Sequence, residues 1–309
     1  KFVLKNFYVR RALRIFPVYY FTIFVIVILH YSWLKLPVTK GEIVAGLTYT
    51  SNFYFYKAGA WTPLTAHFWS LSVEEQFYLF WPLLVLFLPK KYLLLCISLF
   101  IVTGIASQYI IGTTEFGVLL PNACFDNLGA GALLAWLSIY RPDKLPAFYK
   151  IVSVMAALSL LILTGTWLSL IHLERTRTLH ALVGCWLVCY ALLNVNTKTP
   201  LTAILGNPVL TFIGRISYGL YIYHILYYYI GMLLWKKYIL HKLSFIDTTY
   251  HPWIFLTVNF FFLVGFCWLS WQLIEKPMLS FKKYFQYKKH QVPTTQAAPN
   301  GPRPITQEG

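Results

Sequence analysis

Long apolar runs separated by short polar connections dominate the chain. Each run is close to 20 residues, the length at which an α-helix crosses the hydrocarbon core of a bilayer. Eight runs have this length. A further run, 43–56, is shorter and aromatic, which favours a re-entrant or interfacial helix. The pattern predicts an all-α, polytopic membrane helix bundle. Its eight predicted transmembrane helices are 15–34, 68–88, 91–111, 123–139, 150–171, 178–195, 217–235 and 253–274.

One of these predicted spans, 68–88, carries two adjacent carboxylates in an otherwise apolar sequence. A carboxylate at mid-membrane costs roughly 2.5–3.5 kcal/mol on insertion scales, so such groups usually face the bundle interior or a wet cavity and mark function. Helical positions i, i+3, i+7 and i+11 share one face. The predicted stripe on that face consists of His67, Ser70, Glu74 and Tyr78, and a neighbouring polar edge consists of Ser72, Glu75 and Gln76.

Two interpretations of this stripe remain open. Polar side chains in a membrane bundle can form interhelical hydrogen bonds that hold the helices together. Alternatively, a buried carboxyl can serve as a general acid or base, or bind substrate.

Composition supports a membrane protein and excludes an ordinary soluble domain. Hydrophobic residues make up 58% and charged residues 12% of the chain, with a mean hydropathy of +0.59, whereas soluble domains carry roughly 25% charged residues. The net charge of +16 could suggest nucleic acid, but the basic residues gather at the ends of apolar runs. Most of them fall in cytoplasmic loops if both visible termini are cytoplasmic, as the positive-inside rule predicts. We therefore predict a multi-pass protein of the cell membrane that does not bind nucleic acid.

The five cysteines lie in or beside apolar runs, without the paired spacing of a zinc site or a disulfide framework. No metal site is predicted.

A basic segment precedes the first predicted span. Within 6–20, Arg10 and Arg14 share a helix face and Arg11 lies beside them. These arginines are either topogenic charges at a membrane edge or an anion site, because guanidinium groups bind phosphate with forked geometry.

A third polar segment opens the span 217–235. Ser217, Tyr221, His224 and Tyr228 lie on one helix face there. This face suggests a polar cavity, although a lone membrane histidine is more often a structural hydrogen-bond donor.

Four segments together resemble the acyltransferase-3 family of integral membrane O-acyltransferases. They are 7–17 (FYVRRALRIFP), 68–78 (FWSLSVEEQFY), 214–221 (GRISYGLY) with His224, and 274–277 (IEKP). The resemblance covers a membrane acyltransferase domain at 1–280. The remainder, 285–309, lacks periodicity and is predicted to be a disordered cytoplasmic tail.

The resemblance implies a ten-helix bundle that transfers an acyl group, usually acetyl from acetyl-CoA, to a hydroxyl of an envelope or exported glycan. In the family, two further helices precede the basic segment, and the first carries a catalytic arginine and histidine. The domain is therefore expected to be incomplete at its N-terminus.

The resulting hypothesis places Arg10, Arg11 and Arg14 on the phosphates of acyl-CoA at the cytoplasmic mouth. Glu74 and Glu75 are expected toward the outer half of the bundle, opposite that mouth, where they orient the histidine or the acceptor hydroxyl. No cofactor is expected to be bound, and the expected partners are the acyl-CoA donor, a glycan or lipid-linked glycan acceptor, and membrane lipid. The predicted catalytic residues are Glu74, Glu75 and Ser72, and the predicted substrate-binding residues are Arg10, Arg11, Arg14, His67, Trp69, Ser70, Gln76, Tyr78, Arg215, Ser217, Tyr218, Tyr221 and His224.

Two other classes of protein fit part of the pattern. A transporter or flippase of glycan or lipid-linked substrates also needs intramembrane charges and many spans, but such proteins usually show repeated halves, and no repeat is found. A non-catalytic membrane scaffold is the third class.

Overall fold

The computed structural model describes residues 2–32, 34–111, 114, 116–235, 237 and 252–286, and these residues form helices without any strand. The all-α prediction is confirmed. The α-helices are α1 (Phe2–Tyr31), α2 (Lys40–Leu47), α3 (Ser51–Ala58), α4 (Phe68–Phe87), α5 (Lys90–Ile110), α6 (Phe125–Tyr140), α7 (Leu145–Trp167), α8 (Arg177–Leu193), α9 (Pro200–Leu205), α10 (Pro208–Leu234), α11 (Pro252–Ser270) and α12 (Lys276–Ser280). Short 3-10 helices are η1 (Gly117–Leu119), η2 (Pro121–Cys124), η3 (Pro142–Lys144) and η6 (Phe281–Phe285), and η5 (Trp271–Glu275) is a π-helix joining α11 to α12.

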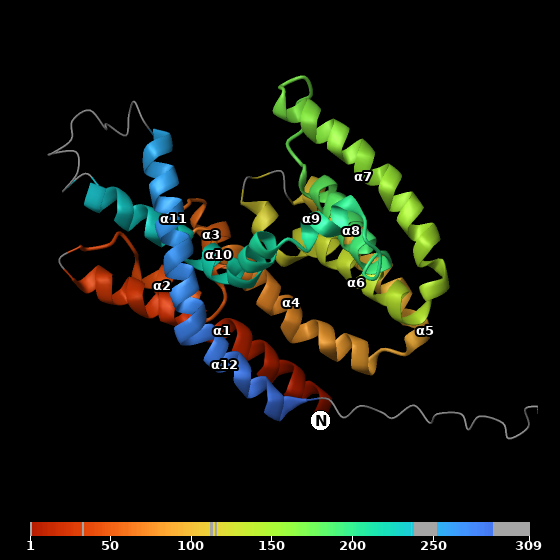
Figure 1. Ribbon diagram of the computed structural model, residues 1–309, viewed down its shortest axis with the longest axis horizontal. Helices are drawn as coiled ribbons and strands as arrows, with labels where there is room; N and C mark the ends of the chain where they lie inside the picture. Colours follow the sequence, from red (N-terminus) through yellow and green to blue (C-terminus); the bar gives the residue numbers. More distant parts are fainter. Residues whose placement is uncertain are drawn as a thin grey trace, which may run out of the picture.

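The helices form two groups connected by α4 (Figure 1). In the first group, α1 packs against α2, α10 and α12, and α10 packs against α11. In the second group, α5 packs against α6 and α7 packs against α8. The larger core belongs to the first group and includes Tyr19, Phe68 and Ile216, whereas a smaller core around Leu134 and Cys189 belongs to the second. Helix α4 therefore carries its polar stripe next to the larger core.

Five described helical segments are long and apolar enough to cross a membrane, which supports a multi-pass protein. The predicted helices at 68–88, 123–139 and 178–195 also form, as α4, α6 and α8. However, α6 and α8 have only 16 and 17 residues, and the polar side chains of α4 lower its hydropathy. The predicted count of eight spans is therefore not confirmed. The five segments are Val3–Tyr31, Lys90–Ile110, Pro142–Trp167, Pro208–Leu234 and Trp253–Phe285.

Helix α1 begins much earlier than the predicted span 15–34. It starts at Phe2 and continues to Tyr31. At a rise of 1.5 Å per residue, Arg11 lies about 13 Å along the helix axis from its beginning. The arginines, predicted to share a helix face ahead of the span, therefore lie in the same helix as the span itself.

The predicted single short helix at 43–56 is wrong, because the segment divides into α2 and α3. Tyr49, between them, adopts a left-handed backbone with φ 53°, which is unfavourable for a bulky residue. Its ring stacks on Tyr19 at 4.4 Å between centroids, and its carbonyl accepts a 2.8 Å hydrogen bond from the Gln76 amide. Tertiary contacts thus hold a conformation that local sequence disfavours.

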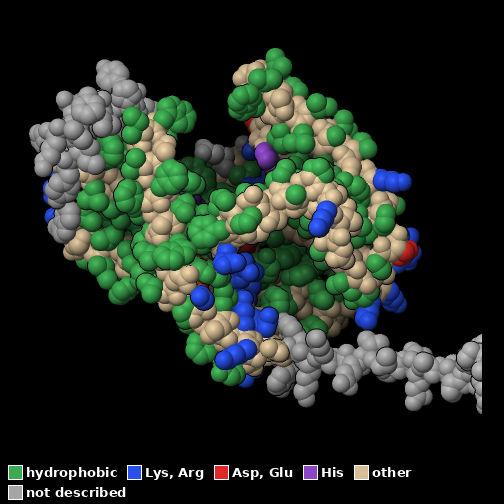
Figure 2. All heavy atoms as spheres, in the orientation of Figure 1, with side chains coloured by type: hydrophobic (Ala, Val, Ile, Leu, Met, Phe, Trp, Pro, Cys, Tyr) green, Lys and Arg blue, Asp and Glu red, His purple; other side chains and the backbone are tan. Residues whose placement is uncertain are grey.

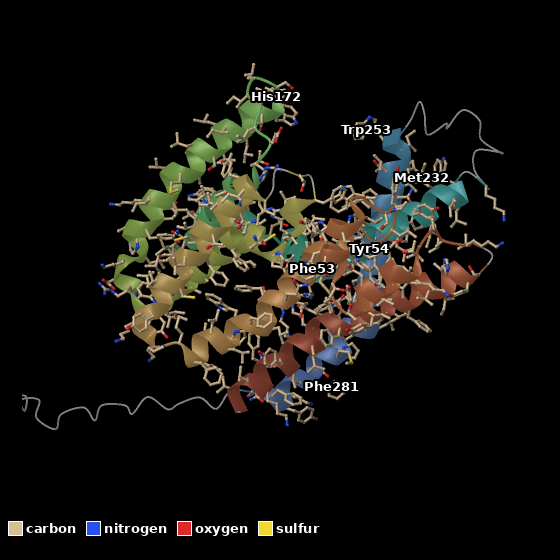
Figure 3. All side chains as sticks on the ribbon, turned by 180° about the vertical axis from the view of Figure 1, so that it is seen from behind. Phe53, Tyr54, His172, Met232, Trp253 and Phe281 are labelled. Atoms are coloured by element: carbon tan, nitrogen blue, oxygen red, sulfur yellow. The ribbon has the colours of Figure 1, made fainter. Side chains whose placement is uncertain are left out.

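The connection between α7 and α8 and the start of α11 lie at the end of the molecule opposite to the C-terminal helices α12 and η6. Figure 3 shows His172, between α7 and α8, and Trp253, at the start of α11, at one end of the molecule and Phe281 at the other. The cytoplasmic placement of the visible termini stays a prediction. The predicted tail, 285–309, lies outside the described residues except for Phe285 and Gln286.

The close crossing of α5 and α6 yields a stability prediction. A Cβ atom added at Gly104 would collide with the backbone nitrogen of Asp126, whereas one added at Gly131 would meet nothing within 4 Å. Gly104→Ala should therefore lower the free energy of unfolding by about 1–3 kcal/mol through overpacking. Thermal unfolding in detergent measures this. Gly131→Ala is the matched control, and equal melting temperatures for the two variants would contradict the predicted crossing.

Candidate functional site

An ion pair joins the basic segment of α1 to the acidic segment of α4. The Arg11 guanidinium donates from Nε to Glu75 Oε1 at 3.1 Å, and its Nη2 lies 3.0 Å from the same oxygen. Glu74 Oε2 lies farther from Nη2, at 3.9 Å. The guanidinium also lies over the Tyr78 ring, 3.3 Å from its centroid. Three side chains of α4 thus converge on one arginine.

The expectation that the carboxylates lie opposite the basic segment is wrong. Arg11 contacts both of them, because α1 begins at Phe2 and carries Arg11 deep into the bundle. The side chains of Arg11 and Glu75 are only 22% and 12% exposed. A charge buried to this extent needs a partner, since desolvation makes an unpaired charge costly.

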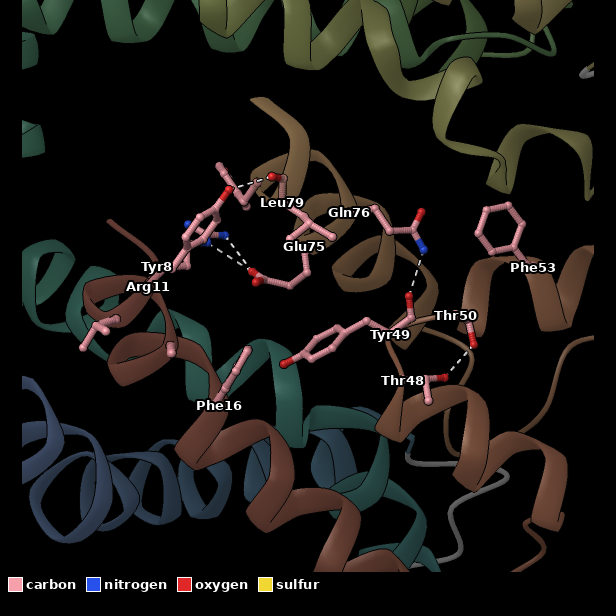
Figure 4. Close-up of a pocket in the computed structure, with 13 residues that line it drawn as sticks. Tyr8, Arg11, Phe16, Thr48, Tyr49, Thr50, Phe53, Glu75, Gln76 and Leu79 are labelled. Carbon is pink, nitrogen blue, oxygen red and sulfur yellow. Dashed lines mark hydrogen bonds and ion pairs between the residues drawn. The ribbon is translucent and has the colours of Figure 1, made fainter. Parts of the chain in front are cut away.

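A cavity of about 530 Å³ lies beside this ion pair, between α1, α4 and the turn that joins α2 to α3 (Figure 4). Its walls are largely apolar, and Arg11 and Glu75 supply the charged groups. The cavity suits a ligand that combines an apolar or extended part with a polar group. It is lined by Tyr8, Val9, Arg11, Ala12, Phe16, Thr48, Tyr49, Thr50, Phe53, Glu75, Gln76, Tyr78 and Leu79.

Ser72 and Gln76, on the second polar edge of α4, hold α3. The Ser72 hydroxyl is buried, accepts from the Ser51 amide at 3.2 Å and donates to the Phe68 carbonyl at 3.0 Å. The Gln76 and Asn52 amides exchange two hydrogen bonds of 3.0 and 3.3 Å. The structure therefore gives both residues a positioning role in the fold, and the catalytic assignment of Ser72 stays a prediction.

The three arginines of α1 have different partners. Arg10 donates from Nη1 to the Lys282 and Phe285 carbonyls at 3.2 and 3.4 Å. It thus supplies hydrogen bonds to two backbone carbonyls of η6. Arg14 is exposed. Lys282, which sequence analysis missed, is close enough to experience the charges of Arg10, Arg11 and Arg14. Arg10, Arg14 and Lys282 form a basic patch, and Figure 2 shows Lys and Arg side chains gathered over this part of α1 and the C-terminal helices.

A second polar cluster, His67, Ser70, Tyr221 and His224, lies where α4 begins beside α10. The His67 Nε2 lies 3.1 Å from the Ile222 carbonyl, and the Tyr221 hydroxyl donates to the His67 carbonyl at 2.9 Å. Ser70 Oγ contacts the same tyrosine hydroxyl. The imidazoles of His67 and His224 lie 5.0 Å apart between centroids. Burial, and secondarily His224, lowers the pKa of His67 to about 4, so this imidazole is neutral near pH 7.

The predicted stripe is confirmed as one continuous face with two different partners. Its beginning, at His67 and Ser70, contacts α10. Its continuation, at Glu74 and Tyr78, contacts Arg11 of α1. Because Ser70 and Glu74 are four residues apart, the two clusters are separated by about 6 Å along the axis of α4.

Of the remaining predicted residues, Tyr218 lies close enough to the Arg11 cluster to interact electrostatically with Glu75 and Arg11, whereas Ser217, Arg215 and Trp69 have other surroundings. Tyr218 donates to the Ile15 carbonyl at 2.9 Å and so ties α10 to α1. Ser217 is exposed and donates to Gly214 within its own helix, and Arg215 is also exposed. Trp69 lies 5.5 Å from the guanidinium of Arg177, a contact that no sequence pattern indicated.

The geometry defines a polytopic helical membrane protein in which one helix, α4, carries two adjacent carboxylates paired with an arginine of α1 and begins at a pair of histidines shared with α10. The chain belongs to acyltransferase family 3, since the family model described as "Acyltransferase domain" matches residues 1–272. The resemblance inferred from the four sequence segments is therefore confirmed.

Relatives of this chain carry names of O-acetyltransferases. Similarity to "Peptidoglycan O-acetyltransferase OatA" of Listeria monocytogenes is 32% identity over 251 residues, covering 72% of this chain and 39% of the relative. A Staphylococcus aureus (strain COL) protein named "Putative O-acetyltransferase" is 28% identical over 260 residues, covering 72% of this chain and 40% of that protein. The chain thus spans about 40% of the length of these curated relatives. No solved structure matches it.

The ion pair can be tested by exchanging its charges. Arg11→Glu would place three carboxylates together and Glu75→Arg would place two cations together, so each variant should melt at a lower temperature. The double exchange should recover part of the loss, with a coupling free energy of about 1–3 kcal/mol. Thermal unfolding in detergent gives this double-mutant cycle.

The exposed pair Arg141–Asp143, at 3.8 Å, is the control. Exchanging its charges should change stability by less than about 1 kcal/mol. Strict additivity at Arg11 and Glu75 would show that their ion pair contributes nothing to the bundle.

Proposed function

We propose that this chain is the membrane part of an O-acyltransferase that moves an acetyl group from acetyl-CoA to a hydroxyl of an envelope or exported glycan. The observation that supports it most directly is the Arg11–Glu75 ion pair at the cavity, because it unites two motif segments of an acyltransferase family. The name of the Listeria monocytogenes relative favours peptidoglycan as the glycan.

The acyl donor, acetyl-CoA, would bind on the side of α4 that faces α1. Its phosphates suit the basic patch, where Arg14 offers a guanidinium fork and Lys282 a compact charge. Its extended thioester arm suits the largely apolar cavity. Arg11 lies between these two regions, held by Glu75 and Tyr78.

The transfer needs a proton acceptor and a group that stabilises negative charge on the carbonyl oxygen. The acceptor oxygen forms a bond to the acyl carbon, the carbon–sulfur bond breaks, and the hydroxyl proton ends on the coenzyme A thiol. Glu75 is the candidate group to orient the proton acceptor or the hydroxyl, as a positioned carboxylate can do. The Arg11 guanidinium is the candidate donor to the oxyanion, because a fixed hydrogen-bond donor stabilises developing charge.

Activity measurements on the full-length gene product in lipid nanodiscs test this proposal. Arg11→Gln and Glu75→Gln should each lower the transfer of labelled acetyl from acetyl-CoA to glycan by about 100-fold, the scale of one acid–base or oxyanion group. Mass spectrometry of the glycan counts the acetyl groups.

Arg141→Gln and Glu174→Gln are the matched controls, because both side chains are exposed and distant in sequence from α1 and α4. They should retain full transfer. Unchanged acetylation in the Arg11 and Glu75 variants would reject their roles, and transport of a glycan without acetyl transfer by the unaltered protein would favour the transporter.

A further inference from the structure

Two imidazoles, His67 beside the start of α4 and His224 on α10, each have one nitrogen within hydrogen-bond distance of a backbone carbonyl. His67 Nε2 lies 3.1 Å from the Ile222 carbonyl, and His224 Nδ1 lies 2.7 Å from the Tyr221 carbonyl. A carbonyl oxygen can only accept, so in each neutral ring the nitrogen facing it carries the proton. The other two nitrogens, His67 Nδ1 and His224 Nε2, are therefore hydrogen-bond acceptors.

The acceptor on His67 has no partner in the part of the chain that the structure describes. His67 is only 8% exposed, and its Nδ1 is buried. Buried polar atoms without a partner are rare in folded proteins and call for an explanation, such as a ligand. The adjacent ring of His224 is exposed, and its centroid lies 5.0 Å from that of His67. The pair thus extends from the surface into the bundle.

The surrounding contacts hold this arrangement in place. The Tyr221 hydroxyl donates to the His67 carbonyl, and Ser70 contacts the same hydroxyl. Tyr221 and His224 lie on one face of α10, so α10 positions both rings. Neither tautomer can change without losing its bond to a carbonyl.

Two acceptor nitrogens on neighbouring rings, with centroids 5.0 Å apart, match a ligand with hydroxyl donors. An anion needs N–H or O–H donors, which these nitrogens do not offer. A metal ion usually takes further protein ligands, and the described residues contain no group of three His, Cys, Asp or Glu that could hold one.

We propose that His67 and His224 bind the sugar hydroxyls of the glycan acceptor. This inference rests on the proposed acyl transfer and names the acceptor side of the same site. His67 and Glu74 are seven residues apart, which is about 10 Å or two helical turns along α4, so a glycan chain held by the histidines can extend along α4 toward the Arg11 cluster and a donor in the cavity.

Side-chain amides can replace these imidazoles while keeping the bonds to the carbonyls. In His67→Gln the amide nitrogen occupies the place of Nε2, and in His224→Asn it occupies the place of Nδ1. Each variant removes only the second nitrogen, the one assigned to the sugar. Losing one hydrogen bond to the acceptor should raise the KM for the acceptor about tenfold.

Steady-state kinetics on the full-length protein in nanodiscs measure this effect. The acceptor probe is a set of oligosaccharides of N-acetylglucosamine and N-acetylmuramic acid released from peptidoglycan, and acetyl-CoA is varied separately. We expect the KM for acetyl-CoA to stay within about twofold of the unaltered protein, since one lost acceptor bond does not touch the donor. An unchanged acceptor KM in both variants, or an equal rise in both KM values, would overturn the proposal.

His180→Asn is the matched control, because His180 Nδ1 also lies 2.7 Å from a carbonyl of its own helix, that of Thr176, on an exposed surface. It should leave both KM values unchanged. If EDTA abolishes activity and zinc restores it only when both histidines are present, the pair is a metal site and the proposal fails. If the unaltered protein transfers no acetyl group at all, the proposed function fails instead, so the two failures are distinguishable.

Discussion

The pairing of charge inside an apolar bundle is the constraint on which the rest of the structure depends. Glu75 and Arg11 are each too buried to remain without a partner, and they find one another across α1 and α4. The ion pair joins α1 to α4 in the wall of the cavity that both helices line. A structural requirement and a candidate chemical site therefore coincide.

The other polar groups of α4 divide into those that build the fold and those left available to a ligand. Ser72 accepts a hydrogen bond from α3 and donates one to the Phe68 carbonyl of its own helix, and Gln76 forms hydrogen bonds with Asn52 of α3 and with the carbonyl of Tyr49. The second nitrogens of His67 and His224 make no hydrogen bond within the part of the chain that the structure describes. The difference depends on the helix that each side chain contacts. Helix α3 provides backbone and amide groups to Ser72 and Gln76, whereas α10 provides carbonyls that bind only one nitrogen of each imidazole.

Much of the site was predictable because helical periodicity determines which residues share a face. The positions of His67, Ser70, Glu74 and Tyr78 required only the 3.6-residue repeat. Their partners did not follow from it, since Arg11 had been expected at the opposite end. Lys282 and Arg177 were missed because each acts through a contact across many residues of sequence, with no local pattern to mark it.

The amino-acid sequence alone determined the membrane class, the helical character, the polar face of α4 and the family, because hydropathy, periodicity and motif spacing are properties of neighbouring residues. Only the tertiary structure decided that α2 and α3 are separate helices, that Arg11 pairs with Glu75, and which imidazole nitrogens face a backbone carbonyl. These features arise from long-range contacts, in which packing can hold a left-handed Tyr49 and desolvation selects a partner for each buried charge.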